Sequence, residues 1–350
     1  MGKLKPGSKA LTWNARLALE ALLKAKLKPA QIAAQLGKAP CTIYREIKRG
    51  RYKHLNHDYT EEWRYSPDLA ERKYQAGLRC RGKDLKIGND HDYAEYLEYK
   101  VSVEGYSPGA ALGEIKRDAD RLKFKTTISK TTFYRYIDNG VFYSLTVKDL
   151  PLQGKRKKKT KSTPRLQKRV SRGDSIDKRP PEVLTRKEIG HWEMDCVEGK
   201  KGTKKTLLVL TERKTRYEII RLMKDKTVGS VIGEINKLER ELGIRRFRKI
   251  FKTITVDNGS EFSDPAALET GLQGTHRTKL FYCHAYHSWE RGSNENANGL
   301  IRRHFPKGMS FAHTSRKAVA KVEAWLNHYP REILGWYSSG MLFDAELARL

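Results

Sequence analysis

Three carboxylates that stand far apart in the sequence, Asp195, Asp257 and Glu295, are the residues best suited to shared chemistry. Asp195 lies in the alternating stretch H-W-E-M-D-C-V-E, Asp257 follows the run T-I-T-V, and Glu295 stands among asparagines. Converging carboxylates repel one another unless divalent cations lie between them, and oxygen-only ligand sets suit Mg2+ or Mn2+. We therefore expect two such ions, which would activate a water or a 3′-hydroxyl for in-line phosphoryl displacement and stabilise the leaving oxygen.

Two of these acids also have an ordinary structural explanation. Asp257 opens D-N-G, which is a frequent turn signal in proteins of any function. Glu295 could be a solvated residue on the surface of a helix. Asp195 is harder to explain in this way, because it interrupts a strand that is otherwise of buried type.

The order of elements after residue 188 predicts how the acids could meet. Strands are indicated at 188–198, 206–212, 216–223, 250–259 and 280–286, with helices at 228–242, 265–270 and from Ser288 onward. This order is that of the ribonuclease H-like fold, an α/β core with a mixed sheet and flanking helices. Its first and fourth strands lie side by side, so Asp195 and Asp257 should be neighbours, and the last helix should place Glu295 opposite them.

The N-terminal residues carry a three-helix pattern that is typical of a helix-turn-helix module. Thr12 is a suitable N-cap, the second helix covers about residues 30–36, and Pro40 starts a third helix that ends near Lys48. The apolar face of the first helix consists of Leu17, Leu19, Ala21, Leu22 and Leu23. The small contact residue, the turn residue and the core residue of the motif are Ala33, Gly37 and Ile43. The side chains expected to face DNA are Thr42, Tyr44, Arg45 and Lys48. A plain helical bundle has similar spacing and stays the alternative.

A second copy of the pattern follows at 105–142. Ser107 and Pro108 start one helix as N-cap and first residue, and Ser129 can cap another. The end of this copy, T-T-F-Y-R-Y-I, resembles C-T-I-Y-R-E-I in the first. The side chains expected to contact DNA here are Thr131, Thr132, Tyr134 and Arg135. Two such modules would cover a longer DNA site than one alone.

Composition indicates a polyanionic partner. The 350 residues include 71 Lys plus Arg and 41 Asp plus Glu, a net charge of +30. Release of counterions from DNA phosphates would supply much of the affinity. A basic surface without a partner and a ribosomal-type protein remain alternatives.

The predicted organisation is a first helix-turn-helix domain (1–54), a helical connecting segment (55–104), a second such domain (105–150), a basic linker (151–184) that contains the run at 155–161, and an α/β catalytic domain (185–350).

The four cysteines, Cys41, Cys80, Cys196 and Cys283, are widely spaced, which predicts neither a disulfide framework nor a structural zinc site. No apolar run is long enough for a membrane span, and the first residues lack an apolar signal region. We expect a cytoplasmic protein.

Several motifs together resemble the DDE transposases of the insertion-sequence family called IS-thirty, whose catalytic core is related to that of retroviral integrases. The matching stretches are L-G-K-A-P-C-T-I-Y-R-E-I-K-R, H-W-E-M-D, V-D-N-G-S-E-F, S-W-E-R-G-S-N-E-N-A-N-G-L-I-R-R-H-F-P-K-G and L-N-H-Y-P-R-E-I-L-G-W. The resemblance implies that Asp195, Asp257 and Glu295 form the catalytic triad. It also implies a supporting shell of Asn294, Asn296 and Arg302, and with Arg303 the last helix would hold the DNA backbone.

The sequence departs from the family pattern at three places. Glu290 stands where Gln is more usual, which creates a second acid, but the family motif places its acid in N-E-N, at Glu295. The two would project from different faces of one helix, because five residues turn a helix through ~500°. The interval from Asp257 to Glu295, 295 − 257 = 38, is longer than usual, and we expect the extra residues at 271–279. Y-S-S-G-M-L-F-D replaces the usual T-P ending.

The resemblance implies a transposase that binds the terminal inverted repeats of its element, hydrolyses a phosphodiester at each end and joins the freed 3′-hydroxyls to target DNA. Its partners would be double-stranded DNA and a second copy of the chain, and it would work at the nucleoid of a bacterium. Two alternatives remain, a DNA-binding regulator that has lost catalysis and a ribonuclease H-type nuclease.

Overall fold

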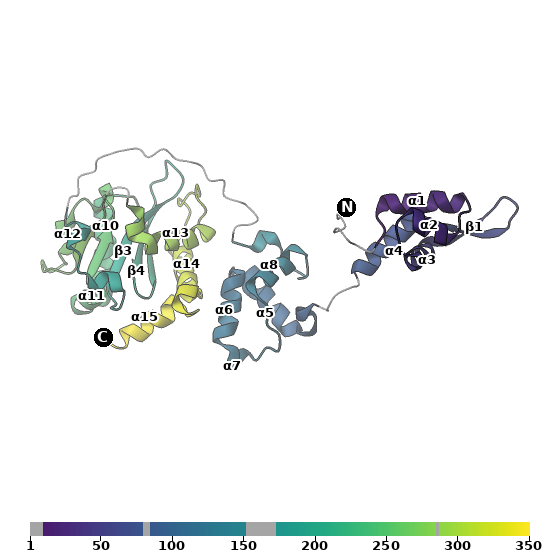
Figure 1. Cartoon of the computed structure of the whole chain (residues 1–350). Coiled ribbons are helices and arrows are strands. Elements are labelled where there is room, and N and C mark those ends of the chain that lie inside the picture. The colour runs from purple at the N-terminus through teal and green to yellow at the C-terminus, as the bar shows by residue number, and fades with distance from the viewer. Residues whose placement is uncertain (1–9, 80–84, 152–172, 285–286) are drawn as a thin grey trace. The chain divides into compact units, whose positions relative to one another are not determined.

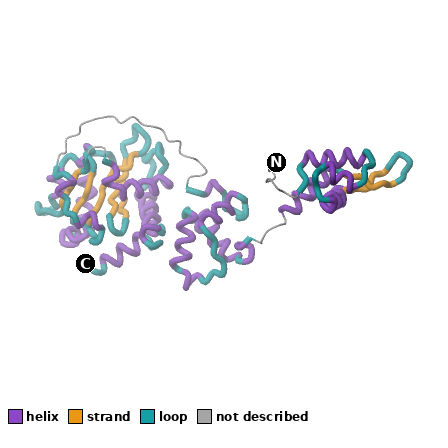
Figure 2. The backbone as a smooth tube through the Cα atoms, in the orientation of Figure 1, coloured by secondary structure: helices purple, strands orange, loops and turns teal. Residues whose placement is uncertain are grey.

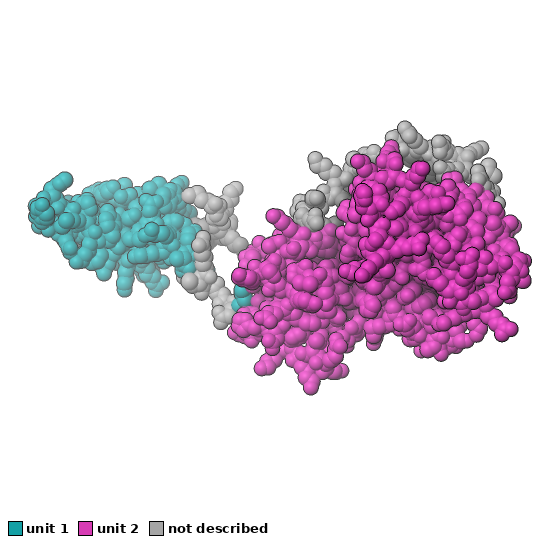
Figure 3. Space-filling model, turned by 180° about the vertical axis from the view of Figure 1, so that it is seen from behind, with its two compact units in different colours: residues 1–85 teal, residues 86–350 magenta. Residues whose placement is uncertain are grey.

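The computed structural model describes residues 10–79, 85–151, 173–284 and 287–350. The chain divides into two compact units, residues 1–85 and 86–350 (Figures 1 and 3). The basic run at 155–161 and Cys80 lie outside the described residues. Among the residues that are described, no helix is both long and apolar enough to cross a membrane.

Unit 1 contains the three predicted N-terminal helices and continues beyond them. Its elements are α1 (Trp13–Lys24), α2 (Pro29–Gln35), α3 (Pro40–Gly50), β1 (Arg51–Leu55), β2 (Glu61–Tyr65) and α4 (Pro67–Arg79). The Thr12 hydroxyl accepts a hydrogen bond from the Ala15 amide and caps α1. Ala33 and Ile43 are buried, and Gly37 has φ +60° between α2 and α3, so the turn uses a backbone conformation that glycine adopts without strain.

The structure differs from two expectations for unit 1. The segment after residue 54 was expected to be a helical connection, but β1 and β2 form an antiparallel hairpin, and α4 packs on α3. Tyr65 and Ala70 belong to the same core as Leu19 and Ile43, so the first domain does not end at residue 54.

The apolar face predicted for α1 is also partly wrong. Leu17 is 44% exposed, whereas Arg16 is buried and pairs with Glu46 and Glu71. Burying this guanidinium is compatible with stability because two carboxylates neutralise it.

Unit 2 begins with a second helical module and ends in the α/β domain. The module contains α5 (His91–Ser102), α6 (Pro108–Arg117), α7 (Ala119–Leu122) and α8 (Lys130–Asp138). Ser107 caps α6 and Ser129 caps α8, as predicted. Helix α5, which the sequence placed in the connecting segment, supplies Tyr93, Leu97 and Val101 to the core of this module. The module therefore begins before residue 105.

The α/β domain contains a five-stranded mixed sheet. Its elements are α9 (Glu182–Thr185), β3 (His191–Glu198), β4 (Thr206–Glu212), β5 (Glu218–Met223), α10 (Val228–Leu242), α11 (Ile244–Ile250), β6 (Thr253–Val256), α12 (Pro265–Glu269), β7 (Lys279–Tyr282), α13 (Gly292–His304), α14 (Arg316–His328) and α15 (Ser339–Leu347). The strand order is β5-β4-β3-β6-β7. Strands β3, β4 and β5 pair antiparallel, whereas β6 pairs parallel with β3 and with β7. The predicted adjacency of the first and fourth strands is confirmed.

Helices cover both faces of this sheet (Figure 2). Leu208 and Leu210 of β4 point into a core shared with α10, α11 and α12, whereas Leu207 and Val209 point into a core shared with α13 and α14. This alternation follows from the two-residue period of a strand. The sheet is therefore the middle layer of the domain; Asp195 lies within its strand β3, and Asp257 directly follows its strand β6.

Three segments of the α/β domain differ from the predicted pattern. Helix α11 was not predicted, because I-R-R-F-R-K-I is dominated by charge; its Phe247 and Ile250 are nevertheless buried. The end of the predicted linker is ordered, since Ser175 forms a β-bridge with Tyr282. Helix α15 packs onto the domain despite the unusual ending, because Phe343 stacks on Tyr217 at 4.1 Å between ring centroids.

The residues predicted to accommodate the longer interval, 271–279, form a turn that is tied down by one arginine. Arg277 is buried, pairs with Glu239 of α10 at 2.9 Å and donates to the backbone oxygens of Ala267 and Leu268. The turn at 271–279 is therefore held against α10 and α12.

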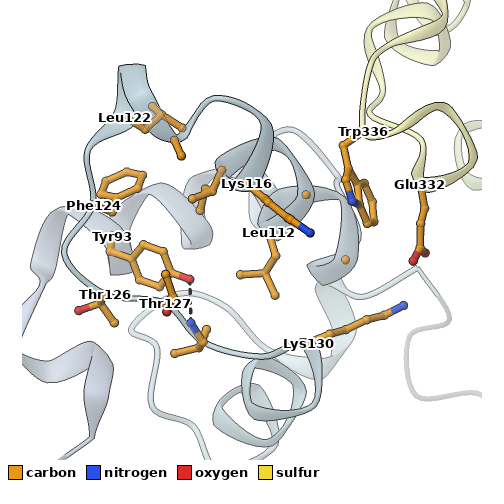
Figure 4. A pocket seen from close by; sticks show the side chains of 15 residues that line it. Tyr93, Leu112, Lys116, Leu122, Phe124, Thr126, Thr127, Lys130, Glu332 and Trp336 are labelled. Atoms are coloured by element: carbon orange, nitrogen blue, oxygen red, sulfur yellow. Dashed lines mark hydrogen bonds between the residues drawn. The ribbon is translucent and has the colours of Figure 1, made fainter.

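The second helical module contacts the C-terminal part of the α/β domain. Trp336 lies against α6 (Figure 4). The indole ring packs on Gly113, where the Cβ atom of any other residue would collide with it. Arg117 donates to the backbone oxygen of Trp336 at 2.9 Å, and the Trp325 indole donates to the Glu104 backbone oxygen at 2.6 Å. These contacts join the module to the domain within unit 2.

We predict that Arg16→Met destabilises unit 1 by ~3–5 kcal/mol, because it leaves the buried Glu46 carboxylate with less compensating charge. Hydrogen exchange of the full-length protein, measured on peptides from α1 to α3, would report the change. Lys24→Met is the matched control; its exposed pair with Glu20 should contribute at most ~1 kcal/mol. Equal effects of the two variants would contradict the role assigned to Arg16.

Candidate functional site

Asp195 and Asp257 share one guanidinium group. An Arg291 terminal nitrogen lies 3.4 Å from Asp195 Oδ1, and the other lies 3.0 Å from Asp257 Oδ2. The aspartate side chains are 21% and 42% exposed, whereas that of Arg291 is 14% exposed. The site is therefore open to solvent on the side of the acids and holds a cation between them.

The parallel pairing of β3 with β6 explains why the two aspartates meet. Glu193 pairs in register with Thr255, and continuing this register by two residues brings Asp195 opposite Asp257. Asp257 also begins the turn that follows β6, where its Oδ1 accepts a hydrogen bond from the Gly259 amide at 2.9 Å. The turn interpretation and the functional interpretation of Asp257 are thus compatible.

Glu295 lies on α13, whose next turn touches Asp195. The Asn298 side-chain nitrogen donates to Asp195 Oδ2 at 2.8 Å, and residues three apart on a helix share a face. Glu295 is exposed, and the carboxylate oxygens of Asp195, Asp257 and Glu295 do not all lie within 4.8 Å of one another. In the described parts of the chain, the one group of three metal-type side chains with donor atoms within 4.8 Å of one another is His284, His287 and Glu290.

A buried carboxylate fixes the start of α13. Glu193, which shares a strand face with Asp195, is fully buried and pairs with Arg213. Its other oxygen accepts a hydrogen bond from the Asn294 amide at 3.0 Å, at the helix end that attracts negative charge. Arg216 also bonds the Ser293 hydroxyl. These contacts set the position of Glu295 relative to β3.

No sequence pattern predicts a role for Glu193, Arg213, Arg291 or Asn298. One signal was present for Glu193, since it occupies the same strand face as Asp195 in H-W-E-M-D. The partners of these residues come from distant segments, which a local pattern does not reveal.

The predicted supporting residues take different positions. Asn294 is buried, and neither Oδ1 nor Nδ2 of its side chain has a hydrogen-bond partner among the described residues, whereas Asn296 is exposed. Arg302 donates to the Glu198 backbone oxygen at 2.8 Å. The Arg303 guanidinium lies 5.3 Å from the centre of the Tyr329 ring. Each role in binding DNA stays a prediction.

The predicted DNA-facing residues of the two helical modules are mostly accessible. The exposed ones are Tyr44, Arg45, Lys48, Thr131 and Arg135; Thr42, Thr132 and Tyr134 are half-buried. The Ser129 hydroxyl, which caps α8, accepts a hydrogen bond from the Thr132 amide and is also hydrogen-bonded to the Thr132 hydroxyl. Burial raises the pKa of Tyr134, and the neighbouring Tyr329 raises it further.

A basic cavity lies between the second helical module and α13. Its volume is about 730 Å3. Gly292, Ser293 and Asn296 line it from α13, and Gly109 and Ala110 line it from α6. The cationic side chains at its wall are Lys130, Arg186, Arg216, Arg303 and Arg331. A phosphate chain that reached Glu295 from this side would meet positive charge.

Glu290 does not lie on the same regular helix as Glu295. It belongs to the short 3-10 turn Ser288–Arg291 that precedes α13. Its carboxylate accepts a hydrogen bond from the His284 amide at 2.9 Å and lies 2.8 Å from His284 Nδ1. Hydrogen bonds to Glu290 and then to Asp177 raise the pKa of His284. The Glu290 carboxylate therefore interacts with His284 and His287 rather than with the two aspartates.

Comparison with known proteins identifies relatives along nearly the whole chain. The chain is 32% identical to "Transposase for insertion sequence element IS4351" of Bacteroides fragilis, over 96% of each protein. It is 31% identical to "Probable transposase for insertion-like sequence element IS1161" of Streptococcus salivarius, over 93% of this chain and 92% of the relative. It is 27% identical to "Transposase InsI for insertion sequence element IS30C" of Escherichia coli, over 93% of this chain and 80% of the relative. No family model matches.

We predict that Arg291→Ala lowers stability in EDTA by ~1–2 kcal/mol, because two partly exposed carboxylates then face each other without a cation. Addition of excess Mg2+ should stabilise this variant more than the wild type, because the ion no longer competes with a guanidinium. Thermal unfolding with and without Mg2+ measures both effects. Arg240→Ala removes the same charge from an exposed position and should respond like the wild type. An identical Mg2+ response of Arg291→Ala and wild type would refute the competition.

Proposed function

The chain belongs to the transposases of insertion sequences, the IS30 (IS-thirty) family among them, and from this premise we propose that it is a DDE transposase with a ribonuclease H-like core. It cleaves the DNA ends of its element by metal-dependent phosphodiester hydrolysis and joins the 3′-hydroxyl ends to target DNA. The observation that carries the proposal is the meeting of Asp195 and Asp257 at one cation, just beyond the paired residues of the parallel strands β3 and β6.

The residues at this place fit a pair of Mg2+ or Mn2+ ions. The donors are carboxylate oxygens, and the positively charged Arg291 already lies against both aspartates. Asp195 and Asp257 would hold the ions, and Glu295 would complete the shell from α13. When bound, the ions would supply the activated water or 3′-hydroxyl and the stabilisation of the leaving oxygen.

Other side chains of the chain would orient this machinery. Asn298 holds the Asp195 carboxylate by its Oδ2, which restricts rotation of that group. Glu193 holds the first turn of α13 through the Asn294 amide, so that Glu295 approaches the aspartates from a fixed helix. Arg291 would leave the aspartates as the ions bind and could then pair with a DNA phosphate.

The DNA partner would be bound by the helical modules and guided to the acids by positive charge. Helices α3 and α8 would read base edges in the terminal inverted repeats through their exposed residues, whereas Arg302, Arg303, Asn294 and Asn296 would contact or support the scissile strand. The basic cavity between α6 and α13 supports a path for that strand, because Asn296, the residue after Glu295, is among the residues that line it. Coordinated transfer of two ends would need a homodimer or a larger assembly on DNA.

We predict that Asp257→Asn reduces Mg2+-dependent cleavage of a labelled terminal repeat by at least ~100-fold, the scale of losing one electrostatic stabiliser of a transition state. Repeat binding should remain, because the helical modules lie elsewhere in the chain. Cleavage and gel-shift assays on the same preparation separate the two effects.

Glu241→Gln is a matched control for the loss of one carboxylate, since Glu241 is exposed near the end of α10 and forms an ion pair with Arg221, away from the aspartates. It should cleave like the wild type. Binding without cleavage by the wild type would favour a regulator, and cleavage that ignores the repeat sequence would favour a ribonuclease H-type nuclease.

We also predict that repeat binding weakens steeply with salt. The log–log slope should be about −0.9 for each phosphate contacted on duplex DNA, because each contact releases condensed counterions. Fluorescence anisotropy across a salt series measures the slope. A flat response would be incompatible with binding dominated by phosphates.

A further inference from the structure

A compact group of two histidines and a carboxylate lies beside the candidate acids. His284 directly follows Cys283 at the end of β7, and His287 and Glu290 follow at intervals of three residues. Their candidate donor atoms all lie within 4.8 Å of one another. The imidazoles of His284 and His287 are 41% and 42% exposed, whereas the Glu290 side chain is 15% exposed. The group is thus anchored by a largely buried acid and is accessible to solvent.

One oxygen of Glu290 faces both imidazoles. Glu290 Oε1 lies 2.8 Å from His284 Nδ1 and 3.2 Å from His287 Nδ1. Donors around a tetrahedral ion with bonds of ~2.0–2.1 Å are ~3.3 Å apart, so both Glu290–histidine distances lie within about half an ångström of that spacing, and the remaining donor pair lies within 4.8 Å. The other oxygen, Oε2, is held by the His284 amide at 2.9 Å, which fixes the carboxylate.

A second carboxylate holds His284 from behind. Asp177, in the short 3-10 turn Ile176–Lys178 near the end of the predicted linker, lies 2.9 Å from His284 Nε2. When Nε2–H donates to this acid, the lone pair of Nδ1 faces Glu290 and His287. This carboxylate–histidine arrangement is the one that orients imidazole ligands in metal sites.

We propose that His284, His287 and Glu290 form a binding site for one Zn2+-class ion, with Asp177 as the supporting carboxylate and water at the remaining position. Two imidazoles and one carboxylate suit Zn2+, Co2+ or Ni2+ better than Mg2+, which prefers oxygen alone. The site is separate from the aspartate pair and does not depend on the catalytic role proposed for it.

The ion would link three parts of the α/β domain. It would tie the end of β7 to the 3-10 turn before α13, and through Asp177 to the segment that bridges to β7 at Ser175. Glu290 is followed directly by Arg291, which spans the two aspartates. Asn258, next to Asp257, donates to the Cys283 backbone oxygen at 2.8 Å. A bound ion would therefore stiffen the loop that carries Arg291.

Titration of the full-length, metal-free protein with Co2+ in excess Mg2+ tests this site. We expect one equivalent with the intense visible absorption of a tetrahedral, nitrogen-containing site, displaced by Zn2+. An octahedral oxygen-only site gives weak absorption, so the aspartate pair cannot produce this signal. His287→Ala and Glu290→Gln should abolish the band, and Asp177→Asn should weaken Co2+ affinity by ~10–100-fold.

Two further variants isolate the proposed ligands. His313→Ala removes an exposed histidine elsewhere in the domain, and Asp257→Asn disables the aspartate pair; both should keep the Co2+ band. Circular dichroism verifies that every variant is folded. The proposal is overturned if the wild type gives no intense band, or if the band persists in folded His287→Ala and Glu290→Gln.

Discussion

The mutual repulsion of Asp195 and Asp257 is the constraint on which the α/β domain is organised. Parallel pairing of β3 with β6 brings the two carboxylates to one place, and a cation must then lie between them. Arg291 supplies that charge from the turn before α13. The same turn leads into the helix that carries Glu295, so charge neutralisation and the position of the third acid depend on one short segment.

Further buried charges support that segment from the same face of β3 that carries Asp195. Glu193 connects Arg213 with the first amides of α13, and Arg216 reaches Ser293 from the turn before β5. Breaking a buried ion pair is costly, since it leaves one charge without compensation. The helix start is therefore fixed by electrostatics as much as by the apolar contacts of Ala297 and Ile301. A site that must hold highly charged groups in a set geometry gains from such rigid support.

Sequence patterns predicted the parts of this structure that depend on local periodicity. The alternation of H-W-E-M-D-C-V-E identified β3, the apolar run in T-L-L-V-L-T-E identified β4, and the amphipathic stretch at 228–242 identified α10. The adjacency of the first and fourth strands followed from element order. Burial of Arg16 and the bridging position of Arg291 were not predictable in this way, because their carboxylate partners lie 30 or more residues away. The hairpin after residue 50 was missed since its charged residues mask a strand pattern.

The buried Arg277 has a consequence for how this chain tolerates changes in length. Because Arg277 closes its turn against α10 and α12, residues can be added between α12 and β7 without shifting either strand that flanks Asp257. Strand β3 has no such freedom, since adding one residue between Glu193 and Asp195 would turn the aspartate toward the opposite layer. The number of residues between Asp257 and Glu295 can therefore change in the loop before β7, whereas the spacing of residues within β3 cannot change. Chains of this kind could differ in the length of that interval and still place Asp195 beside Asp257.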